Sequence, residues 1–330
     1  MFNKKVLITG ATGFIGSHMT ELFIKKGFKV IAFDRYNSNN DWGWLENNKF
    51  SKNDLEIKLG DIRDYDSVYS AMSDCDSVIH LAALIGIPYS LISPLAYIKT
   101  NIEGTYNILE SAKNLKIDNI LITSTSETYG SAQYIPIDEK HEKIGQSPYA
   151  ASKISADQIS MSYYKSYDLP IKIVRPFNTY GPRQSARAII PTIISQLINK
   201  KNKHINLGNL STTRDFTYVV DTCKAFHNIY TNDKFIGTDI NIGTGTEISI
   251  KELYKTISNV LNIDKKIKIK NNRSRSKTFE VDRLVCDNKK LITNSNWKPT
   301  INIEKGIKLF TKWLNENNNI RRYKSETYNV

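Results

Sequence analysis

The chain has 330 residues, of which 40% are hydrophobic and 24% charged, and its formal net charge is +13. This composition predicts a globular protein with one large or two modest domains. No apolar run approaches the ~20 residues of a membrane span. The first strand pattern starts within a few residues of the N-terminus, which leaves no room for a signal peptide, so we expect a cytoplasmic protein without a membrane partner.

The positive charge raises the question of an anionic partner. Its densest portion is residues 265–277, which hold seven lysines and arginines and no acid. Alternation with Ile267 and Ile269 predicts a half-buried strand whose lysines face water. No RNA-binding motif or interleaved aromatic residues accompany this segment. We therefore expect a solvated face, with one or two arginines for a phosphorylated ligand, and no nucleic-acid partner.

The cysteines indicate neither a disulfide framework nor a zinc site. Cys75, Cys223 and Cys286 are far apart and lack a Cys-x-x-Cys spacing. They are interpreted as inert core thiols, and no metal ligands are predicted.

A glycine-rich stretch near the N-terminus predicts a dinucleotide-binding turn. The apolar run 6–8 leads into Thr-Gly-Ala-Thr-Gly-Phe-Ile-Gly at residues 9–16, and a helical pattern follows to residue 23. Gly10 permits the turn, Gly13 lets backbone amides approach a pyrophosphate, and Gly16 allows the helix to pack closely on the strand. The cofactor contacts expected here are Gly10, Thr12, Gly13, Phe14, Ile15 and Gly16.

An acid at the end of the second predicted strand, residues 29–34, favours NAD as the cofactor. Asp34 can accept hydrogen bonds from the adenosine ribose and would repel a 2′-phosphate. Arg35 beside it could serve a 2′-phosphate, which keeps NADP as the alternative.

Further predicted strands at residues 55–59 and 77–81 end at the same edge of the sheet. The first should bring Asp61 and Ile62 to the adenine, and the second should lay Leu81, Ala82 and Ala83 along the dinucleotide.

Strand and helix patterns alternate through the first half of the chain. Helical patterns at 95–116 and 149–167 flank a strand at 119–124, and a sixth strand follows at 170–174. This order predicts an α/β fold with a Rossmann-type, doubly wound parallel sheet and ligands at its C-terminal strand ends. Beyond Tyr180 the alternation breaks up. We therefore divide the chain into an NAD-binding domain, 1–178, and a smaller α/β substrate lobe, 179–330, that exchange segments.

Tyr149 and Lys153 stand four residues apart, hence on one helical face. A nearby ammonium stabilises phenolate, so Lys153 is expected to lower the pKa of Tyr149 towards that of a general base and to hold the nicotinamide ribose. A tyrosine and a lysine four residues apart often occur by chance in a chain with 18 tyrosines. After a dinucleotide turn, and with the hydroxyl-rich strand end at residues 122–130, this spacing predicts a catalytic pair.

The glycine turn, the Tyr-x-x-x-Lys pair and this strand end together resemble an extended short-chain dehydrogenase/reductase acting on nucleotide sugars, over nearly the whole chain. The resemblance implies that Thr125 shares the proton of the sugar O4. Thr125-Ser126-Glu127 is similar to the Thr-Asp-Glu or Thr-Ser-Glu of 4,6-dehydratases, whereas hexose 4-epimerases lack the acid. Glu127 could then remove the C5 proton that a C4 ketone acidifies. Ser126 would relay a proton to the departing C6 hydroxyl, or Glu127 would serve both steps.

Longer stretches narrow the resemblance to one group. Residues 84–90, 146–153 and 175–187 are most similar to the NAD-dependent, nucleotide-linked N-acetylglucosamine 4,6-dehydratases of legionaminic acid biosynthesis. UDP-glucuronate decarboxylases share Thr-Ser-Glu, and residues 207–215 resemble GDP-mannose 4,6-dehydratases. A 4-epimerase and a non-catalytic nucleotide-binding regulator also stay open, as does the choice of uracil or guanine.

The resemblance also implies contacts with the substrate and a homodimer. Asn178 would contact the diphosphate, residues from Arg187 to Pro191 would line the base, and Arg214 and Arg275 would bind phosphate. Arg273 is the alternative to Arg275, because Ser276 stands where the family usually has proline. Related enzymes pair through helices that correspond to 95–116 and 149–167.

Overall fold

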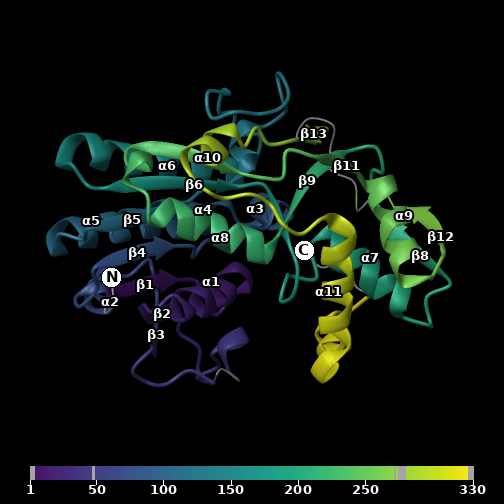
Figure 1. Cartoon of the computed structure of the whole chain (residues 1–330), viewed down its shortest axis with the longest axis horizontal. Helices are drawn as coiled ribbons and strands as arrows, with labels where there is room; N and C mark the ends of the chain where they lie inside the picture. Colours follow the sequence, from purple (N-terminus) through teal and green to yellow (C-terminus); the bar gives the residue numbers. More distant parts are fainter. Residues whose placement is uncertain (1–3, 47–48, 271–272, 274–279, 326–330) are drawn as a thin grey trace.

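The computed structural model describes residues 4–46, 49–270, 273 and 280–325 (Figure 1). Within them a seven-stranded sheet has the order β10-β6-β5-β4-β1-β2-β3, and all its pairings are parallel. Its strands are β1 (Lys5–Thr9), β2 (Lys29–Arg35), β3 (Leu55–Gly60), β4 (Ser77–His80), β5 (Asn119–Thr123), β6 (Ile171–Pro176) and β10 (Thr238–Ile242). The predicted Rossmann-type fold is confirmed.

Helices cover both faces of this sheet, which is why its strands are nearly continuous apolar runs. Val6 and Ile8 of β1 face one core, and Leu7 faces the other. The first core is closed by α1 (Phe14–Lys25) and α8 (Val219–Tyr230), and the second by α2 (Tyr65–Met72), α5 (Gly104–Leu115) and α6 (Pro148–Tyr167). All three of these β1 side chains are fully buried, so close packing on both faces fixes the position of the C-terminal end of the strand.

The helix predicted over 95–116 is interrupted in the structure. After α3 (Ile87–Ile92), α4 (Pro94–Tyr97) passes into a wide π-helical turn, η2 (Ile98–Glu103), before α5 begins. The buried Asn101 in this turn donates through Nδ2 to the Leu84 carbonyl and to Ser152 Oγ, and its Oδ1 accepts from the Leu84 amide. The turn therefore ties the loop after β4 to the helix that carries Tyr149.

The second lobe is smaller and lies on the right in Figure 1. Its central strand β9 (Thr213–Tyr218) pairs with β7 (Asn178–Tyr180), β11 (Glu247–Ser249) and β13 (Arg283–Leu284). This lobe also holds α7 (Ile189–Ile198), β8 (His204–Leu207), α9 (Ile250–Leu261) and β12 (Lys266–Ile269), and α11 (Ile303–Asn315) and η6 (Glu316–Arg322) follow near the C-terminus. With the large sheet are α10 (Lys289–Asn294) and the short helices η1 (Gly43–Leu45), η3 (Ser126–Tyr129) and η4 (Asp233–Phe235). Because β10 and α8 return to the large sheet, the two parts exchange segments.

The cysteines and the lysine-rich strand lie largely as expected. Cys223 and Cys286 are buried, Cys75 is half-buried, and none of them is in a disulfide. In β12 the lysines face outward and Ile267 is half-buried, but Ile269 is 54% exposed, so only one of the two isoleucines turns inward. In the part of the chain that the structure describes, no helix is long and apolar enough to cross a membrane.

Candidate active site

The glycine-rich turn brings the end of β1 against the end of β4. Gly10 has a φ of +68°, and a Cβ there would lie 2.9 Å from the Ala82 amide nitrogen. A Cβ at Gly16 would lie only 2.0 Å from the Gly10 carbonyl oxygen. At the N-terminus of α1, Gly13 provides no side-chain cap for the amides. The turn is thus a backbone cradle with open helix amides, which is what a pyrophosphate requires.

Asp34, at the end of β2, fixes the conformation of the glycine-rich turn and also lies where the adenosine ribose is expected. Its Oδ2 accepts hydrogen bonds from the Thr12 amide (2.8 Å) and the Thr12 hydroxyl (2.6 Å), and its Oδ1 accepts one from the Arg35 amide (2.7 Å). The carboxylate therefore stands at the strand end where an adenosine ribose lies in this fold. An acceptor at this place fits the ribose hydroxyls of NAD, and its negative charge disfavours a 2′-phosphate.

The other predicted cofactor contacts lie at the same edge of the sheet. Arg63 binds the Asp61 carboxylate through Nε at 3.0 and 3.1 Å and lowers its pKa, so Asp61 is already engaged by a cation. Ile62 is buried against Gly104. The amides of Leu81 and Ala82 donate to Thr9 Oγ1, and Ala83 follows, half-buried.

Tyr149 and Lys153 lie in the first turns of α6, where Ser147 caps the helix by accepting from the Ala150 amide. Both side chains are buried, with 6% and 3% of their surfaces exposed. Burial lowers the pKa of Lys153 to about 8, and Asp157 opposes that shift.

Thr125 and Glu127, from the turn after β5, lie beside Tyr149. Burial raises the pKa of Tyr149; a hydrogen bond with the Thr125 side chain opposes this rise, and the Glu127 charge adds to it. Thr125 also caps η3 by accepting from the Glu127 amide at 3.3 Å. Ser126 between them is buried. The structure thus brings together the tyrosine, the hydroxyl and the carboxylate that the sequence singled out.

The expected lowering of the Tyr149 pKa by Lys153 is wrong for this structure. Burial raises the pKa of Tyr149, and Glu127, Tyr97 and Asp157 raise it further. Desolvation of the phenolate outweighs its stabilisation, and Lys153 is itself a weakened cation because it is buried.

A buried ion-pair network under the catalytic helix was not anticipated. Asp157 Oδ2 accepts from Ser124 Oγ at 2.7 Å and from Arg175 Nη2 at 2.8 Å. Arg175 Nη1 donates to Asp239 Oδ2 at 2.9 Å and to the Tyr129 hydroxyl at 3.0 Å. Because breaking such a buried pair costs ~3–5 kcal/mol, it fixes the end of β5 against α6. In the sequence, only the position of Asp157, one helical turn after Lys153, could have indicated that a carboxylate lies on the catalytic face of this helix.

Tyr97 is a second neighbour of Tyr149 that the sequence did not reveal. Its ring centroid lies 6.2 Å from that of Tyr149, and its hydroxyl donates to the Gly86 carbonyl at 2.5 Å. A Cβ on Gly86 would meet Arg187 Nη1 at 2.3 Å, so the glycine leaves space for this guanidinium. Arg187, which was predicted to line the nucleotide base of the substrate, thus lies against Gly86, whose carbonyl accepts the hydrogen bond of Tyr97.

The remaining predicted substrate contacts lie in the second lobe. Asn178 begins β7, and its buried Nδ2 donates to no residue that the structure describes. Arg214 lies on the neighbouring strand β9, is 8% exposed, and approaches Glu280 at 3.6 Å. Pro191 is buried in α7. Arg275 lies outside the described residues. A buried Asn178 amide on β7 and a buried arginine on the adjacent strand β9 suit a diphosphate.

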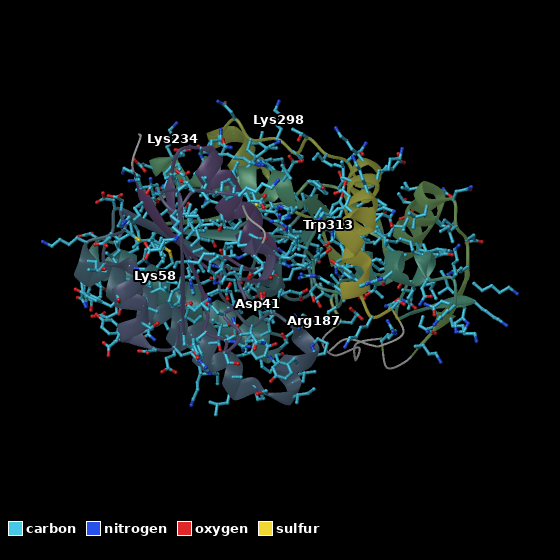
Figure 2. The ribbon with its side chains drawn as sticks, turned by 90° about the horizontal axis from the view of Figure 1, so that it is seen from below. Asp41, Lys58, Arg187, Lys234, Lys298 and Trp313 are labelled. Carbon is cyan, nitrogen blue, oxygen red and sulfur yellow. The ribbon has the colours of Figure 1, made fainter. Side chains whose placement is uncertain are left out.

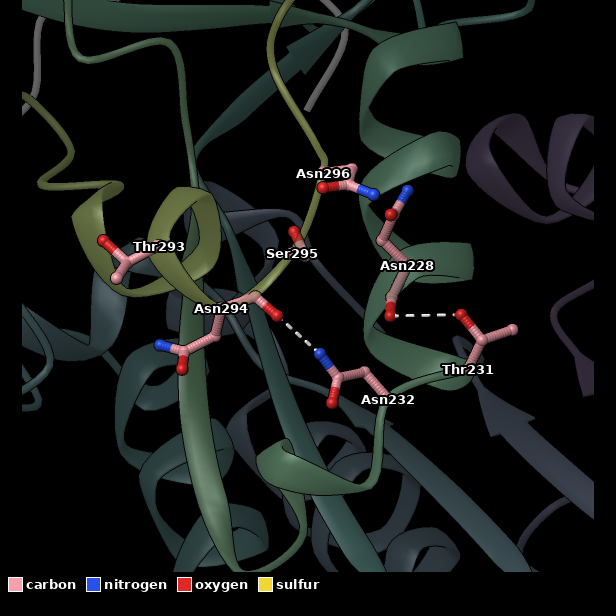
Figure 3. Close-up of a pocket in the computed structure, with 7 residues that line it drawn as sticks. All are labelled: Asn228, Thr231, Asn232, Thr293, Asn294, Ser295 and Asn296. Atoms are coloured by element: carbon pink, nitrogen blue, oxygen red, sulfur yellow. Dashed lines mark hydrogen bonds between the residues drawn. The ribbon is translucent and has the colours of Figure 1, made fainter.

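A hollow of about 370 Å³ between α8 and α10 lies elsewhere (Figure 3). Amide and hydroxyl side chains line it, and Asn232 Nδ2 donates to the Asn294 carbonyl at 2.6 Å. Asn119, the first residue of β5, donates to the Tyr230 carbonyl at the end of α8. This hollow is therefore at the amino edge of the sheet, opposite the edge where ligands bind in such folds.

The sheet, the glycine turn and the Tyr149 helix are those of an extended short-chain dehydrogenase/reductase. The chain belongs to the GDP-mannose 4,6 dehydratase family, whose model matches residues 7–310.

Relatives include both dehydratases and epimerases. A dTDP-D-glucose 4,6-dehydratase of Dictyostelium discoideum is 36% identical over 278 residues, which span 79% of this chain and 63% of the relative. The UDP-N-acetylglucosamine 4-epimerase from Methanobrevibacter ruminantium M1, solved with UDP-N-acetylmuramic acid, is 31% identical (TM-score 0.85; 95% of this chain and 99% of that chain). The dTDP-glucose 4,6-dehydratase DesIV from Streptomyces venezuelae, solved with NAD, is 25% identical (TM-score 0.87; 96% and 98%). The prediction of NAD is confirmed.

Replacing Gly16 by alanine is expected to weaken NAD binding about tenfold or more, since forcing a methyl group into packed structure costs ~1–3 kcal/mol. The methyl would lie 2.0 Å from the Gly10 carbonyl, and Gly10 cannot retreat because Ala82 stands behind it. Titration with NADH, followed by its fluorescence, measures the Kd. Ser17→Ala, at the next position of α1, is the control. Equal affinity of the Gly16→Ala and wild-type proteins would contradict the role of this close approach.

Proposed function

We propose that this protein catalyses the NAD-dependent 4,6-dehydration of a nucleotide-activated N-acetylglucosamine, GDP- or UDP-linked, to the 4-keto-6-deoxy sugar. The proposal places it in the cytoplasm, in the biosynthesis of a legionaminic-type nonulosonic acid or a surface glycan. The observation that carries it is the place of Glu127 on η3, the turn that Thr125 caps, with its carboxylate near enough to raise the pKa of the Tyr149 phenol. A base next to the group that oxidises C4 is what an elimination across C5 and C6 requires.

Tyr149 and Thr125 act on the sugar O4. With Thr125 hydrogen-bonded to it, Tyr149 in its phenolate form is placed to take the O4 proton as the C4 ketone forms, and it becomes the phenol in that step. NAD, when bound, supplies the redox chemistry by taking the C4 hydride and returning it to C6. Lys153, buried on the same helical face, is proposed to hold the nicotinamide ribose.

Glu127 then removes the C5 proton, which the neighbouring C4 ketone has made acidic. The C6 hydroxyl leaves as water, protonated through Ser126 or by Glu127 itself. The sum is loss of one water from the sugar with no net consumption of NAD. Ser126 is too weak an acid to act alone, so its burial next to Glu127 supports a relay from the carboxylic acid.

The choice of N-acetylglucosamine rests on the sequence resemblance and on one solved relative. The Methanobrevibacter epimerase acts on UDP-N-acetylglucosamine and was solved with another UDP-linked N-acetylhexosamine derivative. Asn178 and Arg214, on adjacent strands, are proposed to bind the diphosphate. Arg187, and Arg275 outside the described residues, are proposed as further contacts. GDP-mannose is the alternative substrate, because the family model that matches the chain is that of GDP-mannose 4,6 dehydratase.

A nucleotide-sugar 4-epimerase is the second candidate. It is favoured by the 31% identity with the Methanobrevibacter enzyme over 95% of this chain. An epimerase would use Tyr149, Thr125 and Lys153 in the same way, but would have no use for a base at Glu127.

One assay separates these reactions. The purified protein is incubated in turn with UDP- and GDP-N-acetylglucosamine, GDP-mannose and UDP-glucuronate, and the products are analysed by mass spectrometry. Loss of one water from an N-acetylglucosamine substrate supports the proposal. A product of unchanged mass that separates chromatographically indicates epimerisation, and loss of carbon dioxide indicates decarboxylation. Dehydration of GDP-mannose alone would replace the proposed substrate.

A homodimer through α5 and α6 is part of the proposal. Leu95, Ile98 and Tyr106 are 60%, 50% and 44% exposed on the helices that run alongside α6. Beside them an apolar hollow of about 200 Å³ is lined in part by Pro94 and by the small residue Ala151. An exposed apolar face of this kind is typical of a subunit interface.

Light scattering is expected to give the mass of a dimer. Ile98→Asp should yield a monomer, because it would bury a carboxylate at the centre of this face. Ile269→Asp on β12, where the native side chain is 54% exposed, should leave the dimer intact. A monomeric mass for the wild-type protein would disprove this mode of assembly.

A further inference from the structure

The loop that follows β2, residues 36–46, lies directly on the glycine-rich turn. The Trp44 amide donates to the Thr12 carbonyl at 3.1 Å. Gly43 has a φ of +57°, and a Cβ there would lie 2.8 Å from the same oxygen. Thr12 in turn donates to Asp34 through its amide and its hydroxyl. The position of this loop, here called the cofactor loop, is therefore linked to the turn that receives the dinucleotide.

The C-terminal part of the chain contacts the side chain at the tip of this loop. The Trp313 ring of α11 meets the Trp44 ring edge-on, with centroids 5.4 Å apart. The guanidinium carbon of Arg322, in η6, lies 4.3 Å from the centre of the Trp44 ring. Figure 2 shows Trp313 on the side of α11 that faces the N-terminal half of the molecule. Residues 313–323 are called the C-terminal strap below.

The C-terminal strap is anchored on the second lobe. Phe310 and Leu314 of α11 are fully buried. At the far end of the strap, the Tyr323 hydroxyl donates to the Gln184 carbonyl at 2.7 Å, and the Tyr323 ring contacts that of Trp313. Figure 1 shows α11 running between the large sheet and the second lobe. The strap thus joins a fixed part of the second lobe to the cofactor loop of the first.

We propose that the C-terminal strap retains NAD by holding the cofactor loop down on the glycine-rich turn through Trp44. Lifting the loop from Thr12 moves Trp44, and this requires separating its ring from both Trp313 and Arg322. An aromatic edge contact and a cation over the same indole each oppose that movement. A cofactor that is reduced and reoxidised within one turnover need not leave, so slow release suits a dehydratase and an epimerase equally. The inference goes beyond the proposed reaction and depends only on NAD as the cofactor.

The release rate of NAD tests this directly. The holoenzyme is loaded with fluorescent etheno-NAD and diluted into excess NAD without nucleotide sugar, and the loss of bound fluorophore is followed. Trp313→Leu and Arg322→Ala are each expected to speed release about fivefold, and the double variant more than either, given the usual strength of such contacts. Trp313→Phe, which keeps an aromatic ring, should restore a rate near that of the wild-type protein.

The matched control is Trp42→Leu. Trp42 lies in the same loop, but its indole bonds to Asn40. It should release NAD at the wild-type rate. Unchanged release by the Trp313 and Arg322 variants overturns the proposal, as does equal acceleration by Trp42→Leu. A lower Tm with unchanged release would show that the contacts only stabilise the fold, which also overturns it. Because no nucleotide sugar is present, the result is independent of which sugar reaction the protein catalyses.

Discussion

Replacing Tyr149 by phenylalanine is expected to lower turnover of the nucleotide sugar about 10³-fold, within the range for loss of a general acid–base group. The Tyr149 hydroxyl is buried, hydrogen-bonded with Thr125, and on one helical face with Lys153. Without it, no proton can leave O4 as the C4 ketone forms. Every reaction considered for this site begins with that step, so the loss is expected whether the protein is a dehydratase or an epimerase.

The measurement combines turnover, NAD content and Tm of the variant. NAD content and Tm should stay near those of the wild-type protein, because phenylalanine preserves the buried ring that packs on Tyr97. Tyr163→Phe is the matched control on the same helix, since its hydroxyl bonds to Glu110 Oε2. It should keep wild-type turnover. Substantial activity of Tyr149→Phe would remove this residue from the reaction.

Replacing Glu127 by glutamine is expected to reduce dehydration about 10³-fold while leaving oxidation at C4. The carboxylate lies close enough to Tyr149 to raise the pKa of the phenol, and an amide of the same shape cannot accept the C5 proton. The 4-keto sugar should then persist in the site, and reduced nicotinamide should accumulate as an absorbance that the wild-type protein shows only transiently.

Exchange of the C5 hydrogen in deuterated water makes this test specific. Exchange should be lost in Glu127→Gln, together with release of water. Glu142→Gln, on the nearby loop where the carboxylate accepts from Gln133, serves as the control and should retain both. Full dehydration by Glu127→Gln would exclude this residue as the base. Unimpaired epimerisation by the same variant would identify the protein as an epimerase.

The sequence was sufficient for the parts of the site that depend on local pattern. The alternation of strands and helices predicted the parallel sheet, because burial on both faces imposes long apolar runs that can be read from one segment at a time. Gly10, Gly13, Gly16 and Asp34 predicted the dinucleotide turn from their spacing alone. Tyr149 and Lys153 could be paired because four residues make about one helical turn.

Some expectations needed contacts that no local pattern contains. The predicted helix over 95–116 is broken by a π-helical turn. In this turn the buried Asn101 side chain bonds to Leu84 and Ser152, which belong to other parts of the chain. The pKa of Tyr149 is raised, not lowered, because burial by the surrounding elements outweighs one neighbouring cation. Arg63 already binds the carboxylate of Asp61, which the sequence assigned to adenine alone.

The amino-acid sequence by itself thus determined the fold and the glycine-rich turn with the acid that favours NAD, because each follows from periodicity or spacing within a short segment. The roles proposed for Thr125 and Glu127 came instead from the resemblance to nucleotide-sugar dehydratases. Only the tertiary structure decided how those groups are held. The pairing of Arg175 with Asp157 and Asp239, and the contacts of Trp44 with Trp313 and Arg322, join residues far apart in the chain. Such contacts depend on how whole elements pack, and packing is set by the shape and burial of all of them together.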